Sequence, residues 1–238
     1  MTRNLLTIII PVRREEESIG TTIRLLSKTV QTPYVILIAD DTVDPGDKTI
    51  EVVEKIKHHA PILFSKKRKG DVDGFGPALV RAAKLVTTPY TVVVMADVCD
   101  DPHTIDRMVE RMKKTSCDVV CGCRYMRGGK KFGGPALQGL LSTYLNRFLF
   151  SVLRFPTWDA TNAFKLYNTS FLQSILPDMP MSGVEFSLQL MIRAVAKHAR
   201  VIDIPTVWQG RKQGESKMQL LSRGPKYIRL VIDVVGKS

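Results

Sequence analysis

The segment Tyr90–Pro102 (YTVVVMADVCDDP) brings several carboxylates together directly after an apolar run. Val92–Ala96 has the continuous apolar character of a strand in a parallel sheet that is covered on both faces. Open α/β sheets bind ligands at the carboxyl ends of such strands, and Mg²⁺ and Mn²⁺ prefer carboxylate oxygens. We therefore expect Asp97, the first residue to leave the strand, to bind a divalent metal. The alternative for Asp100 and Asp101 is that they only cap the next helix.

A second carboxylate cluster follows the apolar run Tyr34–Ala39. The segment Asp40–Asp47 contains four aspartates in eight residues. A solvated turn that caps a helix at Thr49–Lys57 would account for Asp47. It would not account for the adjacent pair Asp40-Asp41 that leaves a buried strand, and this pair is a candidate ligand-binding site.

A basic, glycine-rich segment, Lys66–Pro77, precedes a predicted helix at Ala78–Val86. Glycines such as Gly74 let backbone amides approach a ligand, and amides at the start of a helix attract phosphate. A flexible basic loop is the alternative. Its place between two predicted strands favours a phosphate-binding role.

These segments require strands and helices that alternate along the chain. The first hundred residues predict a β-α-β-α-β-α-β order, typical of a doubly wound nucleotide-binding half with a parallel sheet. The second half predicts further strands and helices around basic loops. The strands are expected at Leu5–Val12, Tyr34–Ala39, Pro61–Phe64, Tyr90–Ala96, Asp118–Cys123 and Val201–Val207, and the later helices at Leu137–Leu153 and from Ser182–Phe186 to about His198.

Composition narrows the class of partner. The 238 residues carry a formal net charge of +12, which favours phosphates, nucleic acid or an acidic membrane surface. A nucleic-acid-binding module would not explain aspartates at two strand ends, and no pattern of stacking aromatics supports it.

No apolar run is long enough for a transmembrane helix, and the N-terminus lacks the features of a signal peptide. The four histidines are interpreted as surface residues, and three of the four cysteines as core residues of a strand in a reduced, cytoplasmic protein.

Eight short motifs lie in order between residues 11 and 217. They resemble those of the inverting family 2 glycosyltransferases, and within them the dolichol-phosphate or polyprenyl-phosphate mannose synthase-like enzymes. The last motif is the one that points to lipid-phosphate acceptors. The motifs are Pro11–Ile19 (PVRREEESI), Asp40–Asp44 (DDTVD), Gly74–Ala78 (GFGPA), Met95–Cys99 (MADVC), Cys121–Tyr125 (CGCRY), Asp159–Lys165 (DATNAFK), Gly183–Phe186 (GVEF) and Arg211–Lys217 (RKQGESK).

The resemblance implies a GT-A, Rossmann-like three-layer sandwich with a mostly parallel mixed sheet. It implies one domain over residues 1–220, with a nucleotide-binding half at 1–100 and an acceptor-binding half at 101–220. Residues 221–238 would form an amphipathic tail, which either lies on a membrane surface or packs on the domain.

The resemblance also implies a role for individual residues. Pro11, Arg13 and Glu15 would border the nucleotide base, Asp40 would contact the base or ribose, and Asp41 and Gly74 would complete the nucleotide site. Mg²⁺ or Mn²⁺ would be held by Asp97 with Cys99. Phosphates of donor and acceptor would bind Arg124, Arg211, Ser216 and Lys217, and the catalytic set would be Asp97, Arg124, Arg211 and Lys217.

Three positions depart from the family pattern. Met95 replaces the first aspartate of the metal motif, and Cys99 replaces its glutamine. Asp100 is a candidate to compensate for the lost oxygen ligand. Arg13 replaces a tyrosine near the base, which leaves the identity of the nucleotide open.

The expected reaction transfers a hexose, mannose or glucose, from a GDP- or UDP-sugar to a polyprenyl (dolichyl or undecaprenyl) phosphate. A phosphate acceptor is ionised near neutral pH and needs no strong general base. The enzyme would be peripheral at the cytoplasmic face of a membrane, as a homo-oligomer or with a separate anchoring subunit. One alternative is a sugar-hydroxyl acceptor, with Asp159 or Glu185 as base. Another is a non-catalytic nucleotide-sugar binder.

Overall fold

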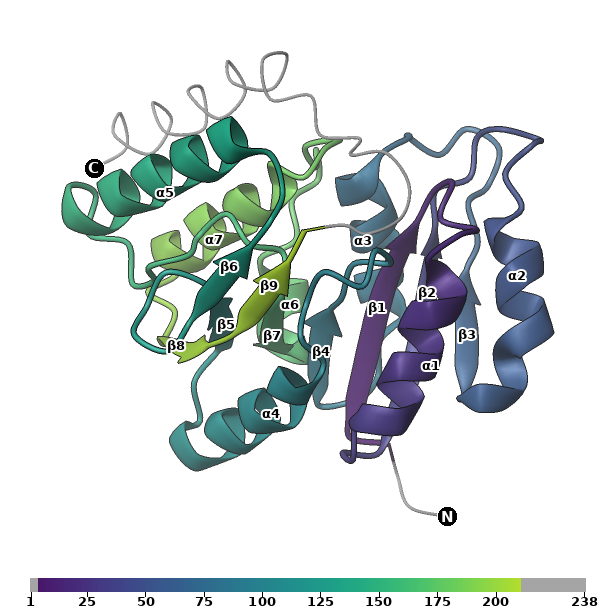
Figure 1. The fold of residues 1–238 in the computed structure, drawn as a ribbon, viewed down its shortest axis with the longest axis horizontal. Helices are drawn as coiled ribbons and strands as arrows, with labels where there is room; N and C mark the ends of the chain where they lie inside the picture. The colour runs from purple at the N-terminus through teal and green to yellow at the C-terminus, as the bar shows by residue number, and fades with distance from the viewer. Residues whose placement is uncertain (1–3, 211–238) are drawn as a thin grey trace.

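A mixed, mostly parallel sheet runs through the centre of the molecule (Figure 1). The computed structural model describes residues 4–210, so Arg211, Ser216, Lys217 and the predicted tail lie outside the described residues. The strands are β1 Leu6–Val12, β2 Tyr34–Asp40, β3 Ile62–Ser65, β4 Tyr90–Val93, β5 Val119–Cys123, β6 Lys130–Phe132, β7 Lys165–Asn168, β8 Val201–Pro205 and β9 Val207–Gln209. Seven of them form the main sheet in the order β3-β2-β1-β4-β7-β5-β8, and β6 pairs with β9 in a separate two-stranded sheet.

Within residues 4–210, strand β7 is the one antiparallel member of the main sheet. It lies between β4 and β5 and runs opposite to both, whereas the other pairs in the main sheet are parallel. The sheet is therefore mixed but mostly parallel, as predicted.

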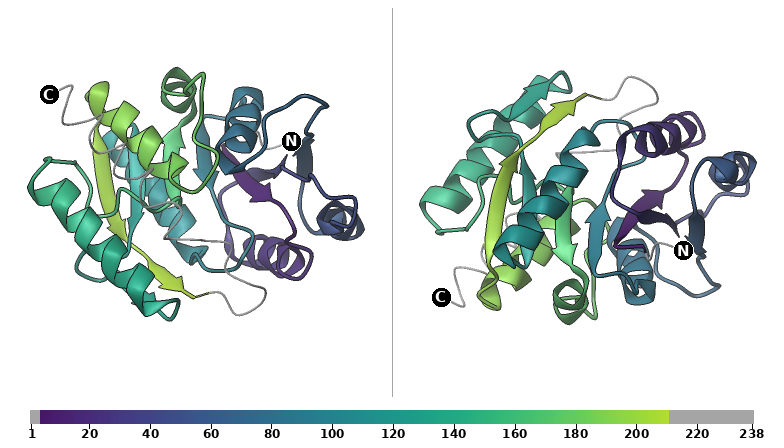
Figure 2. Two further views of the ribbon diagram at one scale, coloured as in Figure 1. Left: turned by 90° about the horizontal axis from the view of Figure 1, so that it is seen from above. Right: turned by 90° about the horizontal axis from the view of Figure 1, so that it is seen from below.

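Helices cover both faces of the main sheet (Figure 2). One face packs against α1, α2 and α4, and the other against α3, α5, α6 and α7. This three-layer arrangement confirms the predicted α/β fold. The helices are α1 Ile19–Thr29, α2 Thr49–Ile56, α3 Phe75–Leu85, α4 His103–Thr115, α5 Ala136–Ser151, α6 Thr169–Ser174 and α7 Phe186–Ala196, with a 3₁₀ turn at Lys57–His59.

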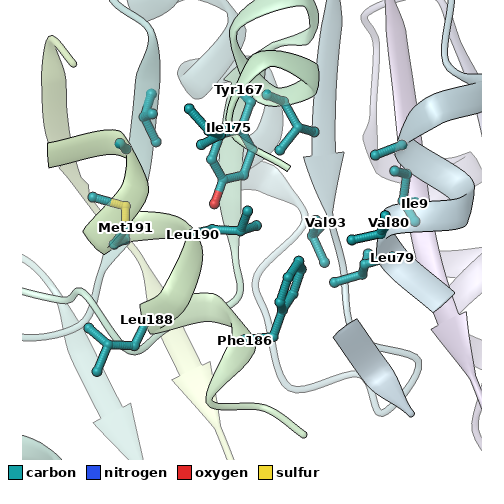
Figure 3. Packing of buried hydrophobic residues seen from close by; sticks show 14 of the residues in the cluster. Ile9, Leu79, Val80, Val93, Tyr167, Ile175, Phe186, Leu188, Leu190 and Met191 are labelled. Carbon is teal, nitrogen blue, oxygen red and sulfur yellow. The ribbon is translucent and has the colours of Figure 1, made fainter. Parts of the chain in front are cut away.

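Strand β1 lies at the centre of the layers. All of its residues are buried, because β2 and β4 flank it and helices cover both of its faces. Ile8 and Ile10 belong to the core on the α1 side, while Ile9 belongs to the core on the α3 side. Figure 3 shows the core on the α3 side, in which Phe186 of α7 lies near Leu79 of α3.

Three element boundaries differ from the sequence prediction. Helix α3 begins at Phe75, since the glycine-rich segment itself forms the first turn. Strand β4 ends at Val93, because the chain turns before it reaches Asp97. The predicted last strand is two strands, β8 and β9. Strand β9 pairs with β6, and β6 lies in a basic segment that was predicted to be a loop. Within residues 4–210, no helix combines the length and apolar character needed to cross a bilayer.

Candidate functional site

The carboxyl ends of β1, β2 and β4 meet at one edge of the sheet. The parallel register pairs Val12 with Asp40, and the Val94 amide donates to the Ile9 carbonyl at 3.0 Å. The loops that follow these three strands carry most of the residues predicted to bind the nucleotide and the metal. The structure therefore brings Arg13, Asp40 and Asp97 to the same edge, as expected for ligand binding in an α/β sheet.

Asp41 connects two loops at this edge. Its carboxylate accepts a hydrogen bond from the Gly74 amide at 2.8 Å and lies 3.7 Å from the Arg13 guanidinium. Burial raises the pKa of Asp41, while the Gly74 amide and Arg13 oppose that rise. Asp41 is therefore placed to position the glycine-rich segment. Asp40 is half-buried, so it is the better placed of the two to reach a ligand.

Gly74 occupies a position that a larger residue cannot take without strain. Its φ is +122°, and a Cβ added there would lie 2.3 Å from the Ser182 carbonyl oxygen. The next amide, that of Phe75, donates to the same carbonyl at 2.8 Å. The glycine thus allows the loop before α3 to approach the loop before α7.

Gly74→Ala is expected to lower the free energy of unfolding by about 2–4 kcal/mol, because it combines backbone strain with a clash against backbone atoms. Gly70→Ala is the matched control, since Gly70 also has a positive φ (+92°) but nothing within 4 Å of its added Cβ. The control should cost only about 1–2 kcal/mol. Urea denaturation of both variants measures the difference, and equal losses would contradict the close approach seen at Gly74.

Two other aspartates of the second cluster have structural partners. Asp44 forms an ion pair with Arg14, and Asp47 accepts hydrogen bonds from the Arg14 amide at 2.7 Å and the Thr49 amide at 2.9 Å. The Gly46 amide and Arg14 lower the pKa of Asp44. These residues join the loop after β1 to the start of α2, which agrees with the capping alternative for Asp47.

The turn after β4 places two carboxylates together. The β-branched residue Val98 has a φ of +60°, an uncommon and strained conformation that is typically tolerated at functional sites. Asp97 accepts a hydrogen bond from the Cys99 amide at 3.2 Å, and the Met95 amide acts to lower the pKa of Asp100. Burial, and secondarily the charge of Asp97, raise the pKa of Asp100 to about 7.

Asp100 fits the role of an additional metal ligand. Its side chain is buried, and one carboxylate oxygen, Oδ1, has no hydrogen-bond partner within the described residues. A divalent cation between Asp97 and Asp100 would offset their repulsion and satisfy this oxygen. Residues 4–210 contain no group of three or more His, Cys, Asp or Glu side chains placed to hold a metal, so further ligands would have to come from elsewhere, such as diphosphate oxygens.

Cys99 does not show the properties of a metal ligand. Its side chain is buried, and its Sγ lies 3.6 Å from the backbone carbonyl of Asp97. Burial and the charge of Asp97 raise the pKa of this thiol, so it stays protonated near neutral pH. The geometry favours Asp100 over Cys99 as the partner of Asp97.

Arg124 is held by a buried ion pair with Asp159. The Arg124 Nε and Nη2 atoms donate to the two Asp159 oxygens at 2.8 and 2.7 Å, and the Arg124 amide donates to the same carboxylate at 3.0 Å. The Asp159 side chain is fully buried and that of Arg124 is 10% exposed. This bidentate pair orients Arg124 close enough to Asp100 for its charge to oppose the rise in the pKa of Asp100.

The same contacts bear on the two candidate bases. Both oxygens of Asp159 accept hydrogen bonds from Arg124, so this carboxylate is not placed to accept a proton from an acceptor. Glu185 is fully buried just before the start of α7. All four histidines are exposed, as predicted.

Sequence reasoning missed Lys165, which is a fully buried cation. Its ammonium donates to the carbonyls of Ala160, at 3.0 Å, and Asn162. Burial lowers its pKa. The lysine thus holds the loop that carries Asp159, and the DATNAFK motif alone could not have indicated this burial.

Strand β9 ends beside the turn at Asp97–Asp101. The Gln209 amide donates to the Cys99 carbonyl at 2.9 Å, and the Asp101 amide donates to the Val207 carbonyl at 3.2 Å. On β6 the Lys131 ammonium lies 5.4 Å from the centre of the Trp208 ring, a cation–π contact that sequence reasoning did not predict. The last described residue, Gly210, therefore follows a strand that is bonded to the segment after Asp97.

An open α/β sheet with a glycine-rich helix start and carboxylates at adjacent strand ends defines a nucleotide-binding protein of the doubly wound class. Residues 7–176 match the family described as Glycosyl transferase family 2, and the chain belongs to this family. The family and the mixed, mostly parallel sheet are those that the sequence resemblance implies.

Two curated relatives illustrate the similarity in sequence. The dolichol-phosphate mannosyltransferase of Pyrococcus furiosus is 24% identical over 217 residues, which cover 90% of this chain and 59% of that protein. The undecaprenyl-phosphate mannosyltransferase of Micrococcus luteus is 24% identical over 214 residues, covering 88% of this chain and 86% of that protein. The chain thus spans less than two thirds of the first relative.

Solved structures show the same fold. Glucosyl-3-phosphoglycerate synthase from Mycobacterium tuberculosis, in complex with Mn²⁺, UDP-glucose and phosphoglyceric acid, matches with a TM-score of 0.73 and 13% identity. The match covers 98% of this chain and 80% of that chain. At this identity the similarity establishes the GT-A fold.

Proposed function

We propose that the protein is an inverting glycosyltransferase that moves mannose or glucose from a GDP- or UDP-sugar to a polyprenyl phosphate at a membrane surface. The observation that carries the proposal is the bonding of β9 to the turn after Asp97. Arg211 follows directly in the chain and opens the RKQGESK motif, which resembles that of lipid-phosphate transferases. Gly210, the residue before this motif, therefore follows a strand that is bonded to the segment after Asp97.

In this proposal Asp97 and Asp100 hold Mg²⁺ or Mn²⁺. The metal would neutralise the charge that develops on the nucleotide diphosphate as it leaves. Arg13 and Asp40 lie at the adjacent strand ends, where they would contact the nucleotide, and the glycine-rich loop at Gly74 borders the same space. Names of two relatives support the polyprenyl-phosphate acceptor, and the complex of the solved neighbour supports a UDP-sugar and Mn²⁺.

The acceptor phosphate provides its own nucleophilic oxygen. It is ionised near neutral pH, so the attack on the anomeric carbon needs no strong base. Both candidate carboxylates fit this expectation, because Asp159 is bonded to Arg124 and Glu185 is buried beneath the surface. The remaining requirement is fixed positive charge that aligns two phosphates, which is the role proposed for Arg211 and Lys217 with Ser216.

The test is nucleotide release from GDP-mannose and UDP-glucose, with Mg²⁺ or Mn²⁺, in the presence and absence of a short polyprenyl phosphate. We expect release that requires both metal and lipid phosphate and that falls about a hundredfold or more in Arg211→Ala. Arg111→Ala on the exposed side of α4 is the matched control and should be as active as the wild type. Release that requires a sugar hydroxyl instead would replace the acceptor assignment, and binding without turnover would indicate a non-catalytic binder.

A further inference from the structure

Helix α5 presents an apolar stripe to solvent. Its members recur at helical spacing, so they lie along one side of the helix. A contiguous exposed patch of this kind marks an interaction surface in an otherwise ordinary protein. The stripe, called the α5 stripe below, consists of Leu137, Leu140, Leu141, Tyr144, Phe148 and Val152, whose exposed fractions range from 43% to 62%.

The opposite side of α5 is already accounted for by packing. Leu149 is fully buried in the core, and Asn146 donates to the Thr161 hydroxyl at 2.8 Å. Figures 1 and 2 show α5 at the periphery of the molecule, outside α7. The α5 stripe is therefore an outward face and not a part of the core.

The charge around the α5 stripe favours an anionic partner. The sequence from Arg124 to Trp158 contains no aspartate or glutamate, and it carries six cations. Arg147 is exposed within the stripe itself, and Arg154 is exposed just beyond the end of α5. An apolar stripe flanked by arginine and lysine is typical of a helix that lies in the interface of an anionic bilayer. Arg124 belongs to the buried pair with Asp159, and the four exposed cations are Arg127, Lys130, Arg147 and Arg154.

We propose that the α5 stripe is the surface by which the protein lies on an anionic lipid bilayer. The inference rests on the proposed function, because it supplies the membrane contact that a lipid-phosphate acceptor needs. Leucine, phenylalanine and tyrosine side chains enter the boundary between headgroups and acyl chains, and the exposed residues Arg147 and Arg154 contact lipid phosphates.

Contacts on the inner side of α5 connect this surface to the site. The Tyr125 hydroxyl donates to the Ser142 hydroxyl at 3.0 Å, and the Thr161 amide donates to the Asn146 side chain at 3.3 Å. Tyr125 follows Arg124 in the chain, and Thr161 belongs to the loop that carries Asp159. A bilayer against the α5 stripe would thus lie one helix away from the Arg124–Asp159 pair.

The test is binding of the full chain to vesicles of phosphatidylcholine with about one third phosphatidylglycerol, measured by flotation. The variant Leu137→Gln/Leu140→Gln removes two stripe residues that are 62% and 53% exposed. The control Leu63→Gln/Leu85→Gln makes the same chemical change at residues that are 58% and 59% exposed on β3 and α3. We expect the stripe variant to bind about tenfold more weakly or worse, the control to bind like the wild type, and wild-type binding to weaken with salt.

Three results would overturn the proposal. One is a wild-type protein that does not float with anionic vesicles, and another is an equal loss in both variants. The third is vesicle binding by the stripe variant that equals that of the wild type. With that result, faster proteolysis of residues 211–238 in the variant would identify the chain's own tail as the occupant of the stripe, and the loss of a dimer formed by the wild type would identify a second copy.

The outcome separates this inference from the proposed function. Stripe-dependent vesicle binding without sugar transfer to polyprenyl phosphate would support the membrane surface and remove the acceptor assignment. Transfer to a short, water-soluble polyprenyl phosphate by a protein that does not bind vesicles would retain the function and reject the α5 stripe as a membrane contact.

Discussion

Asp97→Asn is expected to lower kcat/KM for nucleotide release by about a thousandfold or more and to abolish detectable Mn²⁺ binding. Asparagine keeps the shape of the side chain but removes the charge that would hold the metal. Asp100→Asn should weaken Mn²⁺ binding less, by about 10- to 100-fold, because burial raises the pKa of Asp100 and makes its carboxylate the weaker ligand of the two. Mn²⁺ binding followed by electron paramagnetic resonance, together with nucleotide release, measures both effects.

Stability distinguishes a metal ligand from a structural carboxylate. Asp100 is buried near Asp97, and its pKa is raised to about 7, so its charged form is disfavoured in the folded protein. Asp100→Asn should therefore leave the free energy of unfolding unchanged or slightly higher near neutral pH, even as metal binding weakens.

Asp101→Asn is the matched control for this pair of variants. Asp101 accepts from the His103 amide at 3.1 Å at the start of α4. Asparagine caps a helix about as well as aspartate, so this substitution should change stability by less than about 0.5 kcal/mol and leave Mn²⁺ affinity unchanged. An Asp97→Asn protein that binds Mn²⁺ like the wild type would contradict the proposal that Asp97 is a metal ligand.

Arg124→Met and Asp159→Asn are each expected to lower the free energy of unfolding by about 3–5 kcal/mol. Each change leaves the other side chain of the pair as a buried charge without a partner. The loss of stability from such a charge is larger than the net stability that the intact pair contributes. In the double variant the loss should be smaller than the sum of the two single losses. Denaturation in urea gives all three values.

The exposed pair Lys114–Glu110 on α4 provides the control. Its atoms are 3.9 Å apart and its side chains are 75% and 70% exposed, so Lys114→Met should change stability by less than about 0.5 kcal/mol. Arg124→Lys keeps the charge but loses the bidentate geometry, and should fall between wild type and Arg124→Met. If Arg124→Met kept full stability and lost only turnover, its main role would be phosphate binding, as the sequence resemblance implies.

The strand ends and their carboxylates could be predicted because the signals are local. An apolar run that stops at an aspartate is visible in the chain, and parallel pairing brings such stops to one edge. The contact between Asp41 and the Gly74 amide joins residues far apart in the sequence, so no local pattern indicates it. The same holds for the pairing of Arg124 with Asp159, which turns a predicted phosphate ligand into the centre of a buried ion pair.

Short elements and buried charges were the hardest features to predict. Strand β7 has only four residues, and its first residue is Lys165. A lysine is normally expected at the surface, but the ammonium of Lys165 is buried and donates to two backbone carbonyls. Strands β6 and β9 have three residues each and exist because they pair with one another. Cys99 was predicted to be a metal ligand from its position in the motif alone, and that position does not show that the thiol is buried.

The insertion of β7 between β4 and β5 has a consequence for biosynthesis. A ribosome releases β1 to β4 first, and these strands can pair as they emerge, yet one side of β4 has no neighbour until synthesis has passed Asn168. An unpaired strand edge invites association with other chains, and a pairing so distant along the sequence closes slowly. During synthesis there is therefore a stage at which β1 to β4 are paired but one edge of β4 is still exposed. Chaperones that cover unpaired strand edges would act at this stage.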